Sequence, residues 1–139
     1  MHDVNIDVIE QFRGNNGIIT SGMFKGARLL LLTTTGAKTG QTRVNPLAYT
    51  RDGEKYVVIA SKGGAPTHPD WYHNVVAHPA VTVEAATPSG VERFEARARV
   101  AEGEERQRLF DAQARVMPGF ADYQRKTQRQ IPVVVLEKV

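Results

Sequence analysis

Two glycine-containing loops with basic side chains are the parts of this chain best suited to chemistry. The first is Gly36-Ala37-Lys38-Thr39-Gly40 followed by Arg43, and the second is Ser61-Lys62-Gly63-Gly64. Glycine lets backbone N–H groups converge on a ligand, and Lys38, Arg43 and Lys62 add positive charge there. The pattern predicts an anion-binding site. A plain hairpin connection is the alternative, because such a turn requires neither Lys38 nor Arg43.

Established phosphate and metal motifs fit the chain poorly. A Walker A loop requires Gly-Lys-Ser/Thr and then a helix, whereas Gln41 follows Gly40 and a strand is expected next. His68, His73 and His78 are five residues apart, so on one helix successive rings would not share a face. Because no carboxylate cluster supplements them, a metal site has little support. No serine stands in a nucleophile elbow, so hydrolase chemistry has little support either.

A few single residues near the second loop are also candidates. Ser61 ends a predicted strand and Asn74 lies on a predicted helix, and an apolar core has no use for either. Trp71 and Val75 are four apart, which predicts core packing for Trp71. Tyr123 lies in a polar run, where a phenol can donate a proton to a developing oxyanion.

Length and composition indicate an ordinary soluble domain. The 139 residues suffice for one domain with a core, spanning residues 1–139. Zero cysteines exclude disulfides and thiolate chemistry, and no apolar run reaches the roughly 18 residues of a membrane span. Residues 1–5 show no signal-peptide features, so a cytoplasmic location is expected. From Lys25 to Lys62, seven basic residues accompany two acidic ones, which suggests an anionic partner or simply a solvated charged surface.

Apolar periodicity and turn residues predict short strands with a few helices. Helices are expected at residues 4–13, 70–77 and 102–117, with a last helical turn at 120–128. Strands are expected at residues 29–35, 43–51, 55–61, 81–85, 91–100 and 132–136. The turn at Asp52-Gly53 is a strong hairpin signal. The chain is therefore expected to be α+β, mainly β, with about six mostly antiparallel strands in a closed or partly closed barrel.

The same patterns predict which faces are buried. Leu29–Leu32 indicate a strand buried on both faces. On the 102–117 helix the inward side chains are expected to be Leu109, Phe110, Ala112, Val116 and Met117. The N-terminal helix carries Val4, Val8, Ile9 and Phe12 at helical spacing. That apolar face has two uses, packing on the barrel or peripheral contact with the inner face of a membrane.

Three blocks in this order carry a family resemblance: residues 30–47, Ser61-Lys62-Gly63-Gly64, and Pro69-Asp70-Trp71-Tyr72-His73-Asn74. Together they resemble the deazaflavin-dependent nitroreductase and quinone reductase family of actinobacteria, from about residue 4 to the C-terminus. The resemblance implies a split β-barrel like that of the FMN-binding oxidoreductases, with helices at the N-terminus, in the middle and near the C-terminus. It also implies coenzyme F420, whose phosphodiester and acidic tail suit the basic stretch.

The resemblance assigns the cofactor site residue by residue. The counterparts of Lys38 and Arg43 hold the phosphate region of the coenzyme. The residues that border the cofactor correspond to Asn45, Pro46, Leu47, Ile59, Ala60, Ser61 and Lys62, and Trp71 and Asn74 complete the pocket. Two departures affect the substrate side. Met117 and Phe120 stand where a nitro-drug-activating member has tyrosines, while Tyr123 matches its third, and Ala37 occupies a position that is often basic.

The resemblance therefore predicts an F420-dependent reductase that transfers a hydride to a small-molecule acceptor such as a quinone, an enone or a nitroaromatic. Tyr123, with Ser61, is the expected source of the proton that follows. An FMN-binding barrel of the same class is the first alternative, and a non-catalytic cofactor carrier or lipid-like ligand binder is the second. Nucleic-acid binding is disfavoured, because the chain has no basic recognition helix and no strand that interleaves aromatics with arginines. The oligomeric state does not follow from the sequence.

Overall fold

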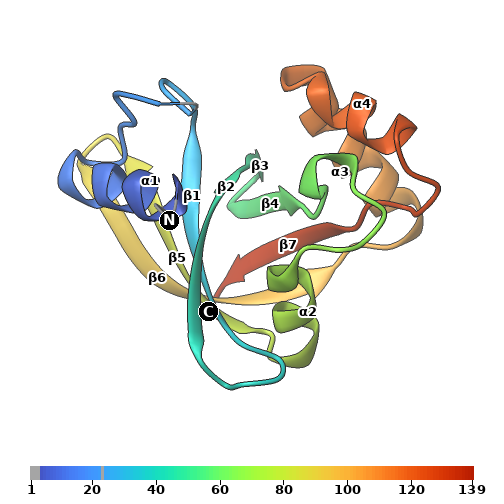
Figure 1. Cartoon of the computed structure of the whole chain (residues 1–139), viewed down its shortest axis with the longest axis horizontal. Helices are drawn as coiled ribbons and strands as arrows, with labels where there is room; N and C mark the ends of the chain where they lie inside the picture. The colour runs from blue at the N-terminus through green and yellow to red at the C-terminus, as the bar shows by residue number, and fades with distance from the viewer. Residues whose placement is uncertain (1–3, 23) are drawn as a thin grey trace.

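The computed structural model describes residues 4–22 and 24–139 as strands curled around a core, with helices packed outside (Figure 1). Residues 1–3 and the side chain of Val4 lie outside the described part of the chain, and so do the expectations that depend on them, namely the signal-peptide features and the place of Val4 on the apolar helix face. The elements are α1 (Val4–Gly14), β1 (Leu29–Thr35), β2 (Thr42–Ala48), β3 (Thr50–Asp52), β4 (Lys55–Ile59), the 3-10 turn η1 (Lys62–Gly64), α2 (Asp70–Ala77), β5 (Ala80–Thr87), β6 (Gly90–Val100), α3 (Gly103–Val116), α4 (Gly119–Arg125) and β7 (Val133–Lys138).

The strands form one antiparallel sheet in the order β2-β1-β5-β6-β7-β4-β3, the topology of a split β-barrel. The predicted single strand at residues 43–51 is wrong, because the chain changes partner at Tyr49. Ala48 still pairs with Leu29 on β1, whereas Thr50 pairs with Val57 on β4. One bent stretch therefore occupies both edges of the sheet, and the described residues form seven strands rather than about six.

Both faces of β1, β4 and β7 are largely buried, whereas β6 alternates between buried and exposed residues. Leu30, Leu32 and Val58 point into the barrel interior, where Trp71 of α2 joins them. Leu29 and Leu31 point outward beneath α1. All four residues of Leu29–Leu32 are at most 4% exposed, so burial on both faces of β1 is confirmed. A second outer layer is formed by β4 and β7 beneath α3.

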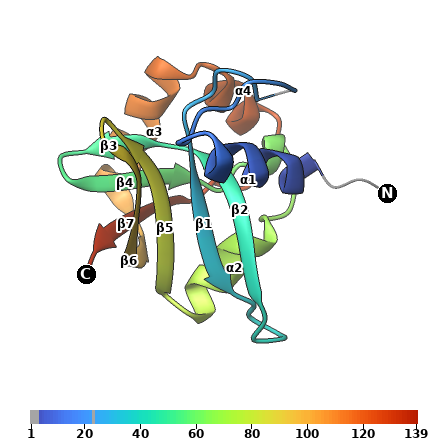
Figure 2. The same cartoon turned by 90° about the vertical axis from the view of Figure 1, so that its left-hand side faces the viewer.

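The N-terminal helix packs on the barrel. Val8 and Phe12 of α1 are buried against the outer face of β1, and α1 crosses in front of β1 and β2 in Figure 2. Arg13 ties this helix to β5 through two hydrogen bonds to the buried carboxylate of Glu84, at 3.0 and 2.8 Å. Among the described residues, no helix is long and apolar enough to cross a membrane.

The buried face of α3 differs from the predicted one near the C-terminal end of the helix. Leu109 and Phe110 are buried as expected, but Val116 is 72% exposed. Gln113 lies on the buried face instead, three residues after Phe110 and four after Leu109, and its side chain is fully buried. Its Oε1 accepts a hydrogen bond from Thr50, while its Nε2 has no partner among the described residues.

Candidate functional site

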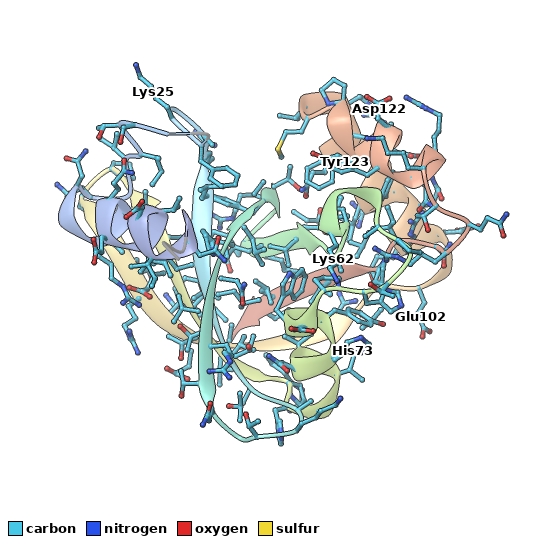
Figure 3. All side chains as sticks on the ribbon, viewed as in Figure 1. Lys25, Lys62, His73, Glu102, Asp122 and Tyr123 are labelled. Carbon is cyan, nitrogen blue, oxygen red and sulfur yellow. The ribbon has the colours of Figure 1, made fainter. Side chains whose placement is uncertain are left out.

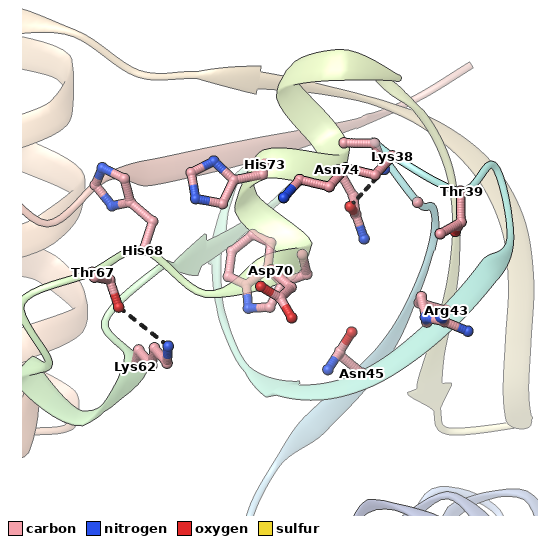
Figure 4. A pocket seen from close by; sticks show the side chains of 13 residues that line it. Lys38, Thr39, Arg43, Asn45, Lys62, Thr67, His68, Asp70, His73 and Asn74 are labelled. Carbon is pink, nitrogen blue, oxygen red and sulfur yellow. Dashed lines mark hydrogen bonds between the residues drawn. The ribbon is translucent and has the colours of Figure 1, made fainter.

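The two glycine loops border one cavity, here called the polar groove, of about 580 Å³. Figure 4 shows Lys62 on one side and Lys38 and Arg43 on the other, so three cationic side chains from separate segments surround the same space. Its lining also includes one carboxylate, that of Asp70. The full lining is Gly36, Ala37, Lys38, Thr39, Arg43, Asn45, Lys62, Thr67, His68, Asp70, Trp71, His73 and Asn74.

The first glycine loop is held from α2 by Asn74. The Ala37 N–H donates to Asn74 Oδ1 at 2.9 Å, and Asn74 Nδ2 donates to Thr34 Oγ1 at 3.1 Å. A backbone N–H can only donate, so these partners fix the orientation of the amide. Asn74 is buried and its amide already has partners on the loop. Its geometry therefore suits holding the Lys38 loop in shape.

The second glycine loop turns sharply just after β4, and from here on the name covers the whole connection, residues 60–68, of which Ser61-Lys62-Gly63-Gly64 is the first part. Ser61 is right-handed (φ −78°), whereas Lys62 and Gly63 have φ of +48° and +65°. The predicted strand at 55–61 therefore stops at Ile59. A non-glycine residue with positive φ costs roughly 1–2 kcal/mol, and such strain is concentrated at functional sites. A right-handed residue followed by a left-handed one also directs successive N–H groups to one side, where they can bind an anion.

The second glycine loop packs directly on α4. Gly64 has φ +85°, and a Cβ there would lie 2.8 Å from the carbonyl oxygen of Tyr123. Any larger side chain would force the loop and the helix apart. Lys62 Nζ reaches back across the loop to Thr67 Oγ1 at 3.2 Å (Figure 4). Lys62 and Tyr123, both labelled in Figure 3, therefore lie on two segments that meet at the close contact of Gly64.

A second cavity, here called the apolar cavity, adjoins the groove and has a volume of about 470 Å³. Both cavities are lined by Lys62 and Trp71. Tyr123 meets Phe120 edge-on at 5.5 Å between ring centroids. The full lining is Phe24, Leu47, Ala48, Ile59, Ser61, Lys62, Gly63, Pro69, Trp71, Met117, Gly119, Phe120 and Tyr123. This space suits a flat, largely apolar group beside the charged groove.

His68 and His73 do not lie on one helix, contrary to the expectation from their five-residue spacing. Because α2 begins at Asp70, His68 lies outside the helix, and its ring centroid is 5.7 Å from that of His73. The expectation that these two rings diverge is therefore wrong. Across the described residues, no group of three metal-ligating side chains is close enough to hold an ion. Burial, reinforced by the charges of Arg129 and His73, lowers the pKa of His68.

The predicted site residues divide between the two cavities. The groove takes Lys38, Arg43, Asn45, Lys62, Trp71 and Asn74, while the apolar cavity takes Leu47, Ile59, Ser61 and Tyr123 and shares Lys62 and Trp71. Pro46 and Ala60 line neither cavity. Ala60 is fully buried in the barrel interior, and alternation on β2 places Pro46 on the opposite face from Asn45 and Leu47.

Several lining residues were not predicted as parts of the site. Thr67, Asp70 and Phe24 are among them. Phe24 had one usable signal, because a large apolar residue in a loop bounded by Gly22 and Gly26 has no strand or helix to bury it. Thr67 and Asp70 line the groove because the second glycine loop folds back toward α2, and short-range sequence patterns do not encode that fold.

Comparison with known proteins identifies close relatives of this chain. A family model described as F420H(2)-dependent quinone reductase matches residues 6–138. The F420H(2)-dependent quinone reductase Rv1261c of Mycobacterium tuberculosis is 40% identical over 130 residues, covering 91% of this chain and 85% of that protein. The solved structure of an F420-H2 dependent reductase (FDR-A) is 44% identical, with a TM-score of 0.70, and covers 79% of this chain and 94% of that one.

A further solved structure, described as a domain-swapped dimer, is 43% identical with a TM-score of 0.71. It covers 79% of this chain and 80% of that chain. Each of the two solved structures therefore matches this fold over 79% of the chain, at 43% and 44% identity.

Proposed function

Because the chain belongs to the F420H(2)-dependent quinone reductase family, we propose that it binds reduced coenzyme F420 and reduces a quinone. The observation that carries the proposal is the placement of three cationic side chains around one groove that adjoins an apolar cavity. When bound, the coenzyme supplies the hydride. The protein supplies the charges, the orientation and the exclusion of water described below.

The polar groove suits the anionic part of the coenzyme. Lys38, Arg43 and Lys62 approach it from the first loop, β2 and the second loop, opposed by one carboxylate, that of Asp70. Hydrogen bonds from such groups to phosphate or carboxylate oxygens contribute roughly 1.5–3 kcal/mol each. Lys62 and Trp71 line both cavities, so they mark where the charged part would give way to the ring.

The apolar cavity suits a flat acceptor and the proton that reduction requires. Leu47, Ile59, Met117 and Phe120 supply apolar walls that limit water. Tyr123 and Ser61 are the hydroxyl-bearing residues in the lining of this cavity. We assign the proton donation to Tyr123, assisted by Ser61, because neither Met117 nor Phe120 carries a donor. Enones and nitroaromatics are proposed as further acceptors of the same shape.

Titration of the ligand-free protein with F420, followed by coenzyme fluorescence, tests the proposal. Lys38→Ala and Arg43→Ala should each weaken binding by about tenfold or more. Lys25→Ala is a matched control, because Lys25 belongs to the same basic stretch but projects away from both cavities (Figure 3). Failure of the wild-type protein to bind micromolar F420 would refute the assignment, and tighter binding of FMN would favour a flavin barrel.

Turnover distinguishes an enzyme from a cofactor carrier. Reduced F420 should be oxidised steadily when menadione is added, and Tyr123→Phe should slow that oxidation without changing F420 affinity. Binding without turnover of any quinone would instead identify a carrier. The proposed partner is thus a small-molecule acceptor. Peripheral membrane contact through α1 gains no support, since Val8 and Phe12 are already packed on the barrel.

A further inference from the structure

Arg129, which lines neither cavity, holds the second glycine loop together. It lies between α4 and β7, and its guanidinium makes five hydrogen bonds to that loop. Nε donates to the carbonyl of Ala65 at 2.9 Å, and Nη2 donates to that of Ser61 at 2.9 Å. Both Nη atoms reach the carbonyl of Ala60 at 3.3 Å, and Nη1 lies 2.9 Å from Nδ1 of His68. Groups from both ends of the loop therefore converge on one cation.

The backbone of Arg129 is itself fixed. Gln124 of α4 donates from Nε2 to the carbonyl of Arg129 at 2.8 Å. The Oε1 of the same side chain accepts from the backbone N–H of Ile131 and from the buried Arg106, both at 2.9 Å. The guanidinium of Arg129 is thus presented from a rigid support. That arrangement is what a side chain needs if it is to impose a shape on a neighbouring loop.

The contact with His68 requires one form of its imidazole. Because a guanidinium can only donate, Nδ1 of His68 must accept, so the ring is neutral with its proton on Nε2. Burial and the charges of Arg129 and His73 lower the pKa of His68, consistent with the neutral form. The groups that face the imidazole or stand beside it are Arg129 from the segment before β7, Tyr72, His73 and Asp70 from α2, and Lys62, which bonds to the adjoining Thr67.

We propose that Arg129 is a positioning residue for coenzyme binding: it fixes the loop that presents Lys62, and it does so while Nδ1 of His68 is free to accept. The proposal rests on the proposed function, because it takes Lys62 to bind the coenzyme. Protonation of His68 removes the acceptor and leaves two cations in contact, so acid loosens the loop. A lysine at position 129 would keep the charge but lose the rigid fork of donors.

The first test compares Arg129→Met and Arg129→Lys with Arg125→Met, a control from the end of α4 whose side chain is exposed. Amide hydrogen exchange of residues 60–68 is measured in the ligand-free proteins, and F420 affinity by fluorescence titration. Both Arg129 variants should exchange in this segment about tenfold faster than the control and bind F420 about tenfold more weakly. Rescue of both properties by lysine would show that charge alone suffices, which would overturn the positioning role.

The second test uses the folded wild-type protein and His68→Asn. The asparagine Oδ1 occupies the place of Nδ1 and accepts without titrating. Because His68 also lines the groove, its positive charge would itself attract the anionic coenzyme, so the loop is followed directly by amide exchange of residues 60–68 in the ligand-free proteins. Between about pH 8 and about pH 5, the protection of this segment should fall more steeply in the wild type than in His68→Asn, and the ratio of the two exchange rates at each pH cancels the intrinsic pH dependence of exchange. His73→Asn, which retains His68, should keep the steep fall and so separates the two imidazoles.

Each result decides between the alternatives. A ratio of exchange rates that stays flat with pH, or an Nε2 of His68 that proves unprotonated by nitrogen NMR, would overturn the role of the imidazole. Wild-type exchange rates in residues 60–68 of Arg129→Lys would overturn the role of the guanidinium even if Arg129→Met fails to fold. Absence of F420 binding by the wild type would refute the proposed function alone, because the exchange rates still report on Arg129.

Discussion

Replacing Asn74 by alanine should destabilise the protein and weaken the groove together. The change removes two hydrogen bonds, from the Ala37 N–H at 2.9 Å and to Thr34 Oγ1 at 3.1 Å. Ala37 lines the groove, so its N–H regains water. Thr34 is 2% exposed, so its hydroxyl loses its partner in a place that water does not reach. With about 1 kcal/mol for the first bond and about 1–3 kcal/mol for the stranded hydroxyl, the free energy of unfolding should fall by about 2–4 kcal/mol.

Urea unfolding of the ligand-free protein measures this loss, which corresponds to a fall of roughly 7–14 °C in Tm for a chain of this size. Val76→Ala on the same helix is the matched control, because Val76 is 57% exposed and should be nearly neutral. F420 affinity should fall in Asn74→Ala, since the Lys38 loop loses its attachment to α2. Lys38→Ala should lose affinity while its stability is unchanged.

Asn74→Asp separates the two effects. An aspartate keeps an acceptor for the Ala37 N–H, and the Thr34 hydroxyl can turn to donate to it, so most of the stability should be retained. The added negative charge enters a groove built from cations, so F420 affinity should still fall. The reasoning would be refuted if Asn74→Ala unfolded within about 0.5 kcal/mol of the wild type, the usual range for surface substitutions.

Three further changes test the packing around the site by urea unfolding or thermal melts. Arg13→Ala should cost about 2 kcal/mol, because it removes two hydrogen bonds from the buried carboxylate of Glu84 and leaves it the more distant Arg93, at 4.0 Å; an unchanged midpoint would contradict this. Gly64→Ala should cost more than Gly63→Ala, since both have positive φ but a Cβ at Gly64 also meets a carbonyl of α4 at 2.8 Å; equal losses would argue against that contact. Thr50→Val combined with Gln113→Leu should leave stability unchanged or raise it by about 1 kcal/mol, because the pair and its unpartnered Nε2 disappear together.

Much of the fold was predictable because local patterns and tertiary packing agree. Alternation, the Asp52-Gly53 turn and the helix between Pro69 and His78 all appear in the structure close to their predicted bounds. The exceptions arise where long-range pairing decides. The partner change at Tyr49 depends on β1 and β4, which are distant in sequence from each other, and the burial of Gln113 depends on Thr50 across the fold.

The candidate site was predictable to the extent that its residues stand in motifs. Lys38, Arg43 and Lys62 could be expected at one place because each accompanies a glycine loop at a strand end. The support of those loops could not. Arg129 lies more than sixty residues after the carbonyls that it binds, in a polar segment that gives no periodic signal. A role of that kind is visible only when the carbonyls are seen to converge.

The position of the site follows from the way the barrel closes. At Tyr49 the chain stops pairing with β1 and starts pairing with β4. Among the described strands, β2 is therefore an edge strand that pairs with β1, and its other edge has no strand partner. Arg43 and Asn45 of β2 line the polar groove, and Leu47 lines the apolar cavity. Both cavities therefore run along this open strand, so the bend that closes the barrel also exposes the edge on which a ligand can lie. The first loop closes the β1–β2 hairpin at one end of this strand, and Asn74 attaches it to α2, whereas the second loop is attached to the segment before β7 by Arg129.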